Sequence, residues 1–284
     1  MFSRDKLLHR PAVGVSGSVE IWETPKGTKY AVKTYHEKEA HESRKEYQNR
    51  VLYEYELLRG IQHEAFYVPT KYTISWTGST VCMYMEAGSR DLAKLLRKQA
   101  SARFNVAENL CYWKQLVSGI LYLHEQGLSH RDIKLENMVL SSTGRLKIID
   151  MATVTASEPA IGIVGSPKYM APEMTTQIRY DGQKADTWSL GIVMVYFATK
   201  TFPWKTAHIS DSEYLAWESE GKLKGVESVP ASFRAFVGML LFVDPDLRKS
   251  IKELSGSKIF VKLPWCHGES TCGTKHTLMK EIDN

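Results

Sequence analysis

The sequence predicts an α+β fold in which antiparallel strands come early and helices dominate afterwards. Residues 17–35 alternate between apolar and polar side chains on both sides of a Pro-Lys-Gly turn, which is typical of a β-hairpin. Residues 43–58 carry apolar side chains at helical spacing, and residues 105–126 are rich in Leu, Trp, Tyr and Val. Residues 187–201 are apolar almost all round, as a buried core helix is. A chain of 284 residues can form one two-lobed domain or two modest domains.

The composition, 43% hydrophobic and 24% charged, is that of a globular protein that folds in water. The net charge of +5 is spread along the chain, so it indicates a weak preference for acidic partners or membrane surfaces and gives little support for nucleic-acid binding. The N-terminus lacks the apolar segment of a secretory signal, and no apolar run is long enough to cross a bilayer. We therefore expect a cytoplasmic protein with no membrane span and no nucleic-acid partner.

Four scattered cysteines suit a reducing compartment better than a disulfide framework. Two of them lie near histidines in the last part of the chain, which raises the alternative of a zinc site, but their spacing matches no common finger. Residues 264–284 are polar, and we expect a flexible tail there. The residues of this cluster are Cys266, His267, Cys272 and His276.

The first predicted strands and helix carry charged residues that need partners. The hairpin ends near Lys33, and the following helix turns several aromatic and aliphatic residues inward. Three carboxylates of that helix, Glu46, Glu54 and Glu56, are alternatives for pairing with Lys33. Residues 81–86 then form an apolar segment that predicts a buried strand.

A group of polar residues between 130 and 150 carries the clearest chemistry. The stretch at 130–137 reads His-Arg-Asp-Ile-Lys-Leu-Glu-Asn, and Asp150 follows thirteen positions later. Phosphoryl transfer needs one carboxylate on the incoming hydroxyl, one cation near the moving phosphoryl and oxygen ligands for Mg2+. Asp132, Lys134, Asn137 and Asp150 supply these groups.

These residues resemble the catalytic loop of the eukaryotic protein kinase family, and the resemblance covers roughly residues 10 to 263. It implies a bilobal protein kinase fold, with a small antiparallel β-sheet N-lobe carrying one helix and a larger, mostly helical C-lobe. We expect the N-lobe at about 1–86, the C-lobe at about 87–263 and the tail at 264–284.

The resemblance implies ATP and Mg2+ as cofactors and assigns roles to the loop. Asp132 would accept the proton of the substrate hydroxyl, Lys134 would contact the γ-phosphate, and Asn137 and Asp150 would hold metal. A lysine two residues after the aspartate is typical of serine/threonine kinases, so the expected partner is a protein with a Ser or Thr acceptor. The family's Asp-Phe-Gly is here Asp-Met-Ala, and Ala152 lacks glycine's freedom at positive φ, so we expect this segment to flip less readily.

The N-terminal part resembles the nucleotide-binding half of the family. Residues 14–19 resemble the end of the glycine-rich loop, and residues 31–33 resemble the third-strand lysine motif. The helix register favours Glu54 as the partner of Lys33. The implied nucleotide contacts are Ala12, which replaces the usual first glycine, and Gly14, Gly17, Val19, Ala31, Lys33, Met85, Glu86, Gly88 and Asp91.

The segment from 165 to 173 resembles the part of the family that contacts the peptide substrate. Ser166 would bridge Asp132 and Lys134, and Glu173 would pair with Arg248, since a buried carboxylate demands a partner. Asp186 would hold the backbone of the catalytic loop.

The activation segment of this chain departs from many kinases. Gly162 stands where they carry an activating phosphothreonine, and Thr153, Thr155 and Ser157 are the remaining acceptors. We hypothesise that activity does not require phosphorylation in this segment.

Details of the N-terminal part, including the Tyr-Ala-Val-Lys-Thr-Tyr stretch at 30–35, resemble fungal kinases that regulate nutrient permeases and potassium transporters. The chain starts a short distance before its glycine loop, so we expect no N-terminal regulatory extension, and we expect a monomer. Two alternatives remain at this point: a pseudokinase acting as a nucleotide-binding scaffold, suggested by Ala12 and the Asp-Met-Ala triplet, and a small-molecule kinase. The intact segment around Ser166 and Glu173 disfavours the second.

Overall fold

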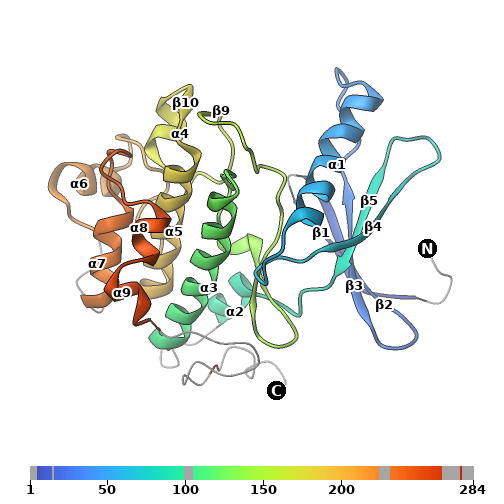
Figure 1. Ribbon diagram of the computed structural model, residues 1–284, viewed down its shortest axis with the longest axis horizontal. Helices are drawn as coiled ribbons and strands as arrows, with labels where there is room; N and C mark the ends of the chain where they lie inside the picture. Colours follow the sequence, from blue (N-terminus) through green and yellow to red (C-terminus); the bar gives the residue numbers. More distant parts are fainter. Residues whose placement is uncertain (1–4, 15, 99–104, 224–230, 264–275, 277–284) are drawn as a thin grey trace. The chain divides into compact units, whose positions relative to one another are not determined.

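The computed structural model describes residues 5–14, 16–98, 105–223, 231–263 and 276. The chain divides into two compact units, which Figure 1 colours along the sequence. The first unit contains Met1–Ser89 and Ile149–Ala152, and the second contains Arg90–Ile148 and Thr153–Asn284.

The first unit is built on a five-stranded antiparallel sheet with strand order β1-β2-β3-β5-β4. The predicted hairpin is confirmed as β2 and β3, and its turn closes where Gly27, at φ +81°, donates its N–H to the Thr24 carbonyl at 2.9 Å. The predicted buried strand is β5. The strands are β1 (Lys6–Val13), β2 (Gly17–Glu23), β3 (Lys29–Tyr35), β4 (Pro69–Ile74) and β5 (Val81–Glu86).

One helix, α1 (Arg44–Gly60), accompanies this sheet and confirms the prediction for residues 43–58. It begins with a capping box, in which the Ser43 hydroxyl accepts from the Glu46 N–H and the Glu46 carboxylate accepts from the Ser43 N–H. Its inward face contains Tyr47, Val51 and Glu54, and the last of these is the one charged residue among the buried residues of the helix. The helix therefore carries one charged group into the interior of the first unit.

The second unit is mostly helical and is organised around α5 (Gly182–Thr199), which is buried along nearly its whole length and packs against α3 and α7. The sequence predicted a start at 187. The helix begins five residues earlier because Asp181 caps it, accepting the Lys184 N–H at 2.9 Å. The other helices are α2 (Leu92–Lys98), α3 (Val106–Glu125), which confirms the predicted 105–126, η2 (Leu135–Asn137), α4 (Pro172–Thr176), α6 (Ser212–Glu220), α7 (Ala231–Leu240), α8 (Ile251–Ser255) and α9 (Lys258–Val261).

Two small sheets complete the second unit and fix its loops. One has the order β6-β7-β8 and flanks the 130–137 loop, and the other pairs β9 with β10. In the described part of the chain, no helix has the length and apolar character needed to cross a membrane. The strands are β6 (Arg90–Asp91), β7 (Met138–Leu140), β8 (Leu146–Ile148), β9 (Ala160–Ile161) and β10 (Arg179–Tyr180).

The expected tail and its cysteine–histidine cluster lie outside the described residues except for His276. The His276 ring meets the ring of Tyr112 edge to face at 5.0 Å, and its Nδ1 is 3.1 Å from the Tyr112 hydroxyl. Within the described ranges, no group of three or more His, Cys, Asp or Glu side chains could hold a metal ion.

Candidate active site

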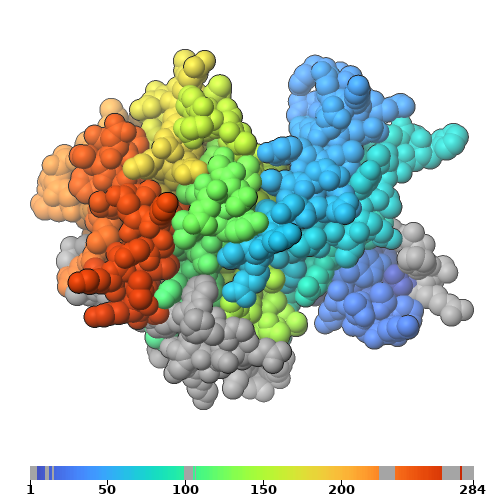
Figure 2. Space-filling view, in the orientation of Figure 1, coloured from blue at the N-terminus to red at the C-terminus, as the bar shows by residue number. Residues whose placement is uncertain are grey.

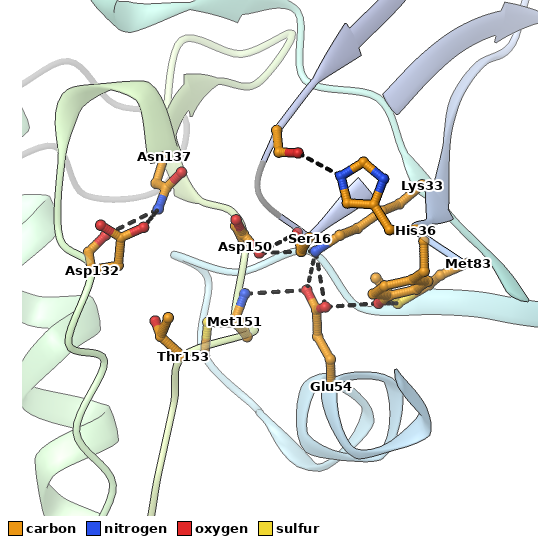
Figure 3. A network of polar contacts seen from close by, with 12 residues as sticks. Ser16, Lys33, His36, Glu54, Met83, Asp132, Asn137, Asp150, Met151 and Thr153 are labelled. Atoms are coloured by element: carbon orange, nitrogen blue, oxygen red, sulfur yellow. Dashed lines mark hydrogen bonds and ion pairs between the residues drawn. The ribbon is translucent and has the colours of Figure 1, made fainter. Parts of the chain in front are cut away.

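The first half of the candidate site is a buried cluster around Lys33, in the first unit (Figure 3). Its Nζ atom lies 2.8 and 2.9 Å from the two carboxylate oxygens of Glu54 and 2.8 Å from Oδ1 of Asp150. Of the three carboxylates considered, Glu54 is therefore the one that pairs with Lys33. Glu46 is used in the capping box, and Glu56 is exposed.

Two further groups donate hydrogen bonds to the Glu54 carboxylate, and the sequence did not reveal them. The Tyr35 hydroxyl donates at 2.7 Å, and the Met151 N–H donates at 3.1 Å. The second contact joins α1 directly to the Asp150-Met151-Ala152 segment. Met151 is fully buried, so methionine fills an apolar slot there. Asp150 has φ +65° whereas Ala152 is not at positive φ, so the alanine is unstrained in this conformation.

The electrostatics of the cluster keep Lys33 charged. Burial by itself would lower the pKa of Lys33, but the carboxylates of Glu54 and Asp150 outweigh it, and the pKa is raised above its ordinary value. Burial also raises the pKa of the Tyr35 hydroxyl, and Glu54 adds to the effect. Tyr35 therefore remains a neutral donor to the carboxylate, and Lys33 remains a cation.

The glycine loop contributes a contact that was missed. The Ser16 hydroxyl donates to Oδ1 of Asp150 at 3.3 Å, and the His36 ring lies 2.9 Å from the Gly14 carbonyl oxygen (Figure 3). Gly17 has no room for a side chain, because a Cβ would lie 2.2 Å from the Thr34 carbonyl oxygen. Ser16 lies between the two glycines that the sequence singled out, which is the signal that could have found it.

The other expected nucleotide contacts occupy defined places. In the first unit, Ala12 pairs with Val19 across β1 and β2, Ala31 with Met85 across β3 and β5, and Glu86 ends β5. Gly88 follows in the connection between β5 and β6. Asp91 belongs to the second unit, where its carboxylate accepts the Lys94 N–H at 2.9 Å at the start of α2.

The second half of the candidate site is a triangle of three side chains in the second unit. Lys134 Nζ lies 2.6 Å from Oδ2 of Asp132 and 3.1 Å from the Ser166 Oγ, and the Ser166 hydroxyl donates to Oδ1 of Asp132 at 3.1 Å. Ser166 thus bridges the aspartate and the lysine as expected. Gly165 allows this close approach, since it is at φ +99° and a Cβ would lie 2.5 Å from the Arg131 carbonyl oxygen.

Asn137 lies beside this triangle, and its orientation suits a metal ligand. Its Nδ2 donates to the Asp132 carbonyl at 3.0 Å and to the Asp132 carboxylate at 3.3 Å (Figure 3). This arrangement assigns the amide nitrogen to Asp132 and leaves the oxygen, a hard donor that Mg2+ prefers, for another partner. Asp150 in the first unit is also an oxygen donor, and its side chain is 28% exposed. Each of these two oxygens is of the kind that Mg2+ prefers.

The backbone of the catalytic loop is held by Asp186 of α5. Its carboxylate accepts the N–H groups of His130 and Arg131, both at 2.7 Å, and contacts His124 Nε2 at 2.9 Å. Arg131 is at φ +65°, an uncommon conformation for a residue with a side chain. Asp186 thus stabilises a strained loop, and His124 is a member of this network that the sequence did not indicate.

A buried ion pair anchors the end of the 165–173 segment. Glu173 receives two bonds from the guanidinium of Arg248, at 2.5 and 3.1 Å, and both side chains are almost fully buried. The same guanidinium donates to the carbonyls of Lys184, Phe242 and Val243. The expected pair is therefore present, and the backbone carbonyls satisfy the remaining donors.

Comparison with known proteins identifies the family. Residues 13–260 match the model of the protein kinase domain. The chain is 30% identical over 283 residues to the probable serine/threonine-protein kinase RTK1 of Saccharomyces cerevisiae, covering 92% of this chain and 45% of that protein. It is 32% identical over 210 residues to the nitrogen permease reactivator protein of the same yeast, covering 71% and 26%. It is 29% identical over 279 residues to the serine/threonine-protein kinase hal4 of Schizosaccharomyces pombe, covering 92% and 43%.

These matches confirm the resemblance to fungal kinases, one of which is named for a nitrogen permease. The chain spans less than half the length of each of these relatives. The family match covers most of the chain, and each of the two units contains polar residues of the types that phosphoryl transfer needs. The chain belongs to the protein kinase domain family.

Proposed function

We propose that this protein is a serine/threonine protein kinase that transfers the γ-phosphate of ATP to protein hydroxyl groups. The observation that carries the proposal is the triangle of Asp132, Lys134 and Ser166, in which each side chain contacts the other two. A carboxylate fixed beside a cation and a hydroxyl is suited to orienting an acceptor hydroxyl and taking its proton.

In this proposal, each residue of the triangle has a separate task. Asp132 accepts a hydrogen bond from the substrate hydroxyl and then its proton, as the new phosphate ester bond forms and the bond between the γ-phosphorus and the oxygen of the departing ADP breaks. Lys134 stays beside Asp132 and provides positive charge where negative charge develops. Ser166 hydrogen-bonds to both and fixes their relative positions, and it belongs to the segment on which a peptide would lie.

The cofactors are ATP and Mg2+. Bound Mg-ATP supplies the phosphoryl group and the metal charge that neutralises the phosphate oxygens. Asn137 and Asp150 would hold the metal, and the Lys33 ammonium, oriented by Glu54, would contact the phosphates. Removal of Mg2+ with a chelator should therefore abolish transfer.

The proposed regulation follows from Arg131. Its guanidinium donates to the carbonyl oxygens of Thr153 at 2.8 Å and Ile161 at 3.0 Å, so two main-chain groups of the activation segment occupy it. The Tyr180 hydroxyl also donates to the Gly162 carbonyl at 3.0 Å. These contacts support an activation segment that needs no phosphate. Phosphatase-treated protein should retain full activity, and silence until an upstream kinase is added would contradict this.

The relatives support a fungal-type serine/threonine kinase, and we propose that its substrates include proteins that control transport of nutrients or ions. The pseudokinase alternative gains nothing from the structure, because a scaffold has no need for Asp132, Lys134 and Asn137 in one bonded cluster. A cytoplasmic location is part of the proposal.

The acceptor specificity can be tested with a peptide library. Labelled γ-phosphate from Mg-ATP is offered to three matched libraries whose fixed acceptor is Ser, Thr or Tyr. We expect incorporation into the Ser and Thr libraries and background incorporation into the Tyr library. Preferential labelling of the Tyr library would contradict the assignment, and labelling of none, with ATP bound, would favour the pseudokinase.

A further inference from the structure

The two edges of the sheet in the first unit are protected differently. The β1 edge carries two register irregularities, between Leu7 and His9 and between His9 and Ala12, and it contains Pro11, which has no N–H. Bulges, prolines and charges are the devices by which proteins prevent an edge strand from pairing with another chain. The β4 edge also begins with a proline and carries a lysine, Pro69 and Lys71, with one irregularity between them, so its protected part ends at Lys71. From Tyr72 to Ile74 its register is regular.

The regular part of β4 and the residues that follow it form what we call the open edge, residues 72–76. This segment contains neither a charged residue nor a proline. Among the described residues, no strand pairs with its outer side. Figure 2 shows the hairpin between β4 and β5 projecting from the surface of the first unit. The open edge is therefore available as a template for a further strand.

The register shows which backbone groups point outward. The Ser75 N–H donates to the Thr80 carbonyl at 2.8 Å, and the Thr80 N–H donates to the Ser75 Oγ at 3.0 Å, which closes the ladder at the turn. The Val81 N–H donates to the Tyr47 hydroxyl at 3.3 Å and not to Ile74, as expected for the partner in a non-hydrogen-bonded pair. Because the two kinds of pair alternate in an antiparallel ladder, Ile74 and Tyr72, opposite Val81 and Met83, are the pairs whose N–H and C=O groups turn away from β5.

The open edge has an apolar side chain at every second position, and all five of its residues are exposed. Tyr72 is 38% exposed, Ile74 is 39% exposed and Trp76 is fully exposed. Side chains two residues apart lie on the same face of a strand, so Tyr72 and Ile74 share one face of β4, and Trp76 follows in the turn beyond it. An added strand would find these apolar side chains beside its own alternate residues. A fully exposed tryptophan at a hairpin tip has no packing role within the first unit.

The charges near the open edge indicate the partner. The Arg59 guanidinium lies 5.7 Å from the ring of Tyr55, whose edge meets the Tyr72 ring at 4.8 Å. At the other end, Arg44 lies along the turn, with its Cδ 2.9 Å from the position a Cβ of Gly78 would take. A second copy of this chain would bring these positive charges against each other, whereas an acidic segment would complement them.

We propose that the open edge binds an extended, acidic segment of a partner protein as an additional strand. Backbone groups of Tyr72 and Ile74 hydrogen-bond to it, its apolar residues at alternate positions contact the row that ends at Trp76, and its carboxylates lie near Arg59 and Arg44. This recruitment surface is independent of phosphoryl transfer, so its test needs no ATP.

The test uses a displayed library of random short peptides, selected on the unaltered protein. Selected clones are then measured on Ile74→Pro, which removes one outward N–H and no ladder bond, and on the matched control Ile74→Val, which keeps the N–H. We expect acidic clones with alternating apolar residues whose binding is about tenfold weaker on Ile74→Pro and on Arg59→Glu and unchanged on Ile74→Val. N-methylation of alternate peptide amides should weaken binding by a similar factor. This measurement uses the unaltered protein, so it tests the proposal even if Ile74→Pro fails to fold.

Several results would overturn the proposal. The first is the absence of any clone that discriminates between Ile74→Pro and Ile74→Val, together with equal binding of methylated and unmethylated peptides. Sedimentation that reveals a dimer dissolved by Ile74→Pro would identify a second copy as the occupant. Binding of anionic lipid vesicles that depends on Trp76, with no peptide selected, would identify a membrane instead.

Discussion

Replacing Glu54 by glutamine should both destabilise the protein and impair catalysis, because four donated hydrogen bonds converge on this carboxylate. They come from Lys33, at 2.8 and 2.9 Å, from the Tyr35 hydroxyl at 2.7 Å and from the Met151 N–H at 3.1 Å. Glutamine has the same shape, but it turns one acceptor oxygen into a donor that faces other donors.

The expected loss of stability follows from the burial of the Lys33–Glu54 pair and from the Asp150 carboxylate that remains beside Lys33. Removing one partner of a buried ion pair costs about 3–5 kcal/mol, because the other charge is left uncompensated. Asp150 stays 2.8 Å from the Lys33 ammonium and compensates part of its charge, so we expect a loss at the lower end of this range, about 3 kcal/mol. Misplacement of the Lys33 ammonium should lower kcat/KM by about 100-fold.

The assay combines urea unfolding with steady-state kinetics on one Ser/Thr peptide. The control is Glu56→Gln on the same helix, since Glu56 is exposed and such substitutions change stability by about 0.5 kcal/mol or less. If the free energies of unfolding of the two variants differ by less than about 1 kcal/mol, the buried cluster does not have the energetic role described.

Two other predictions concern the second unit. Gly165→Ala should reduce activity strongly, because Gly165 is at φ +99° and a Cβ there would lie 2.5 Å from the Arg131 carbonyl oxygen. The control Gly127→Ala, at φ +72° with no atom within 4 Å of the added Cβ, should cost only the conformational strain of about 1 kcal/mol. Equal kcat/KM for the two variants would contradict this. The Ser250 N–H and hydroxyl lower the pKa of Glu253 to about 2, so its stabilisation is present above its ordinary value of 4.5 and is lost as the pH falls toward 2. The Tm of Glu253→Gln should therefore lie below that of the unaltered protein near neutral pH, with the difference closing at acidic pH, and a constant difference would refute the linkage.

The parts of the fold and site that the sequence predicted are those encoded in short stretches. Residues 130–137 place a carboxylate, a cation and an amide within eight positions, and the helical spacing around Glu54 separates it from the outward-facing carboxylates of α1. Apolar periodicity located the hairpin and the longer helices because it persists over several turns or strand residues.

The parts that the sequence did not predict depend on contacts between distant segments. The bond between Ser16 and Asp150 joins residues 134 positions apart, and His124 contacts Asp186 across 62 positions. Arg131 binds main-chain carbonyls, which carry no side-chain signature. The start of α5 was missed because its first turn is polar and depends on the cap at Asp181.

The most direct test of the central claim compares nucleotide binding and phosphoryl transfer in Asp132→Asn and the unaltered protein, with Mg-ATP and a Ser/Thr peptide. Asparagine keeps the shape and part of the hydrogen bonding to Lys134 but cannot accept a proton. We predict equal ATP affinity in both proteins and loss of at least about 100-fold in transfer for Asp132→Asn. Equal transfer in the two proteins, with ATP bound to both, would contradict the assignment of Asp132 as the base and of this chain as a kinase.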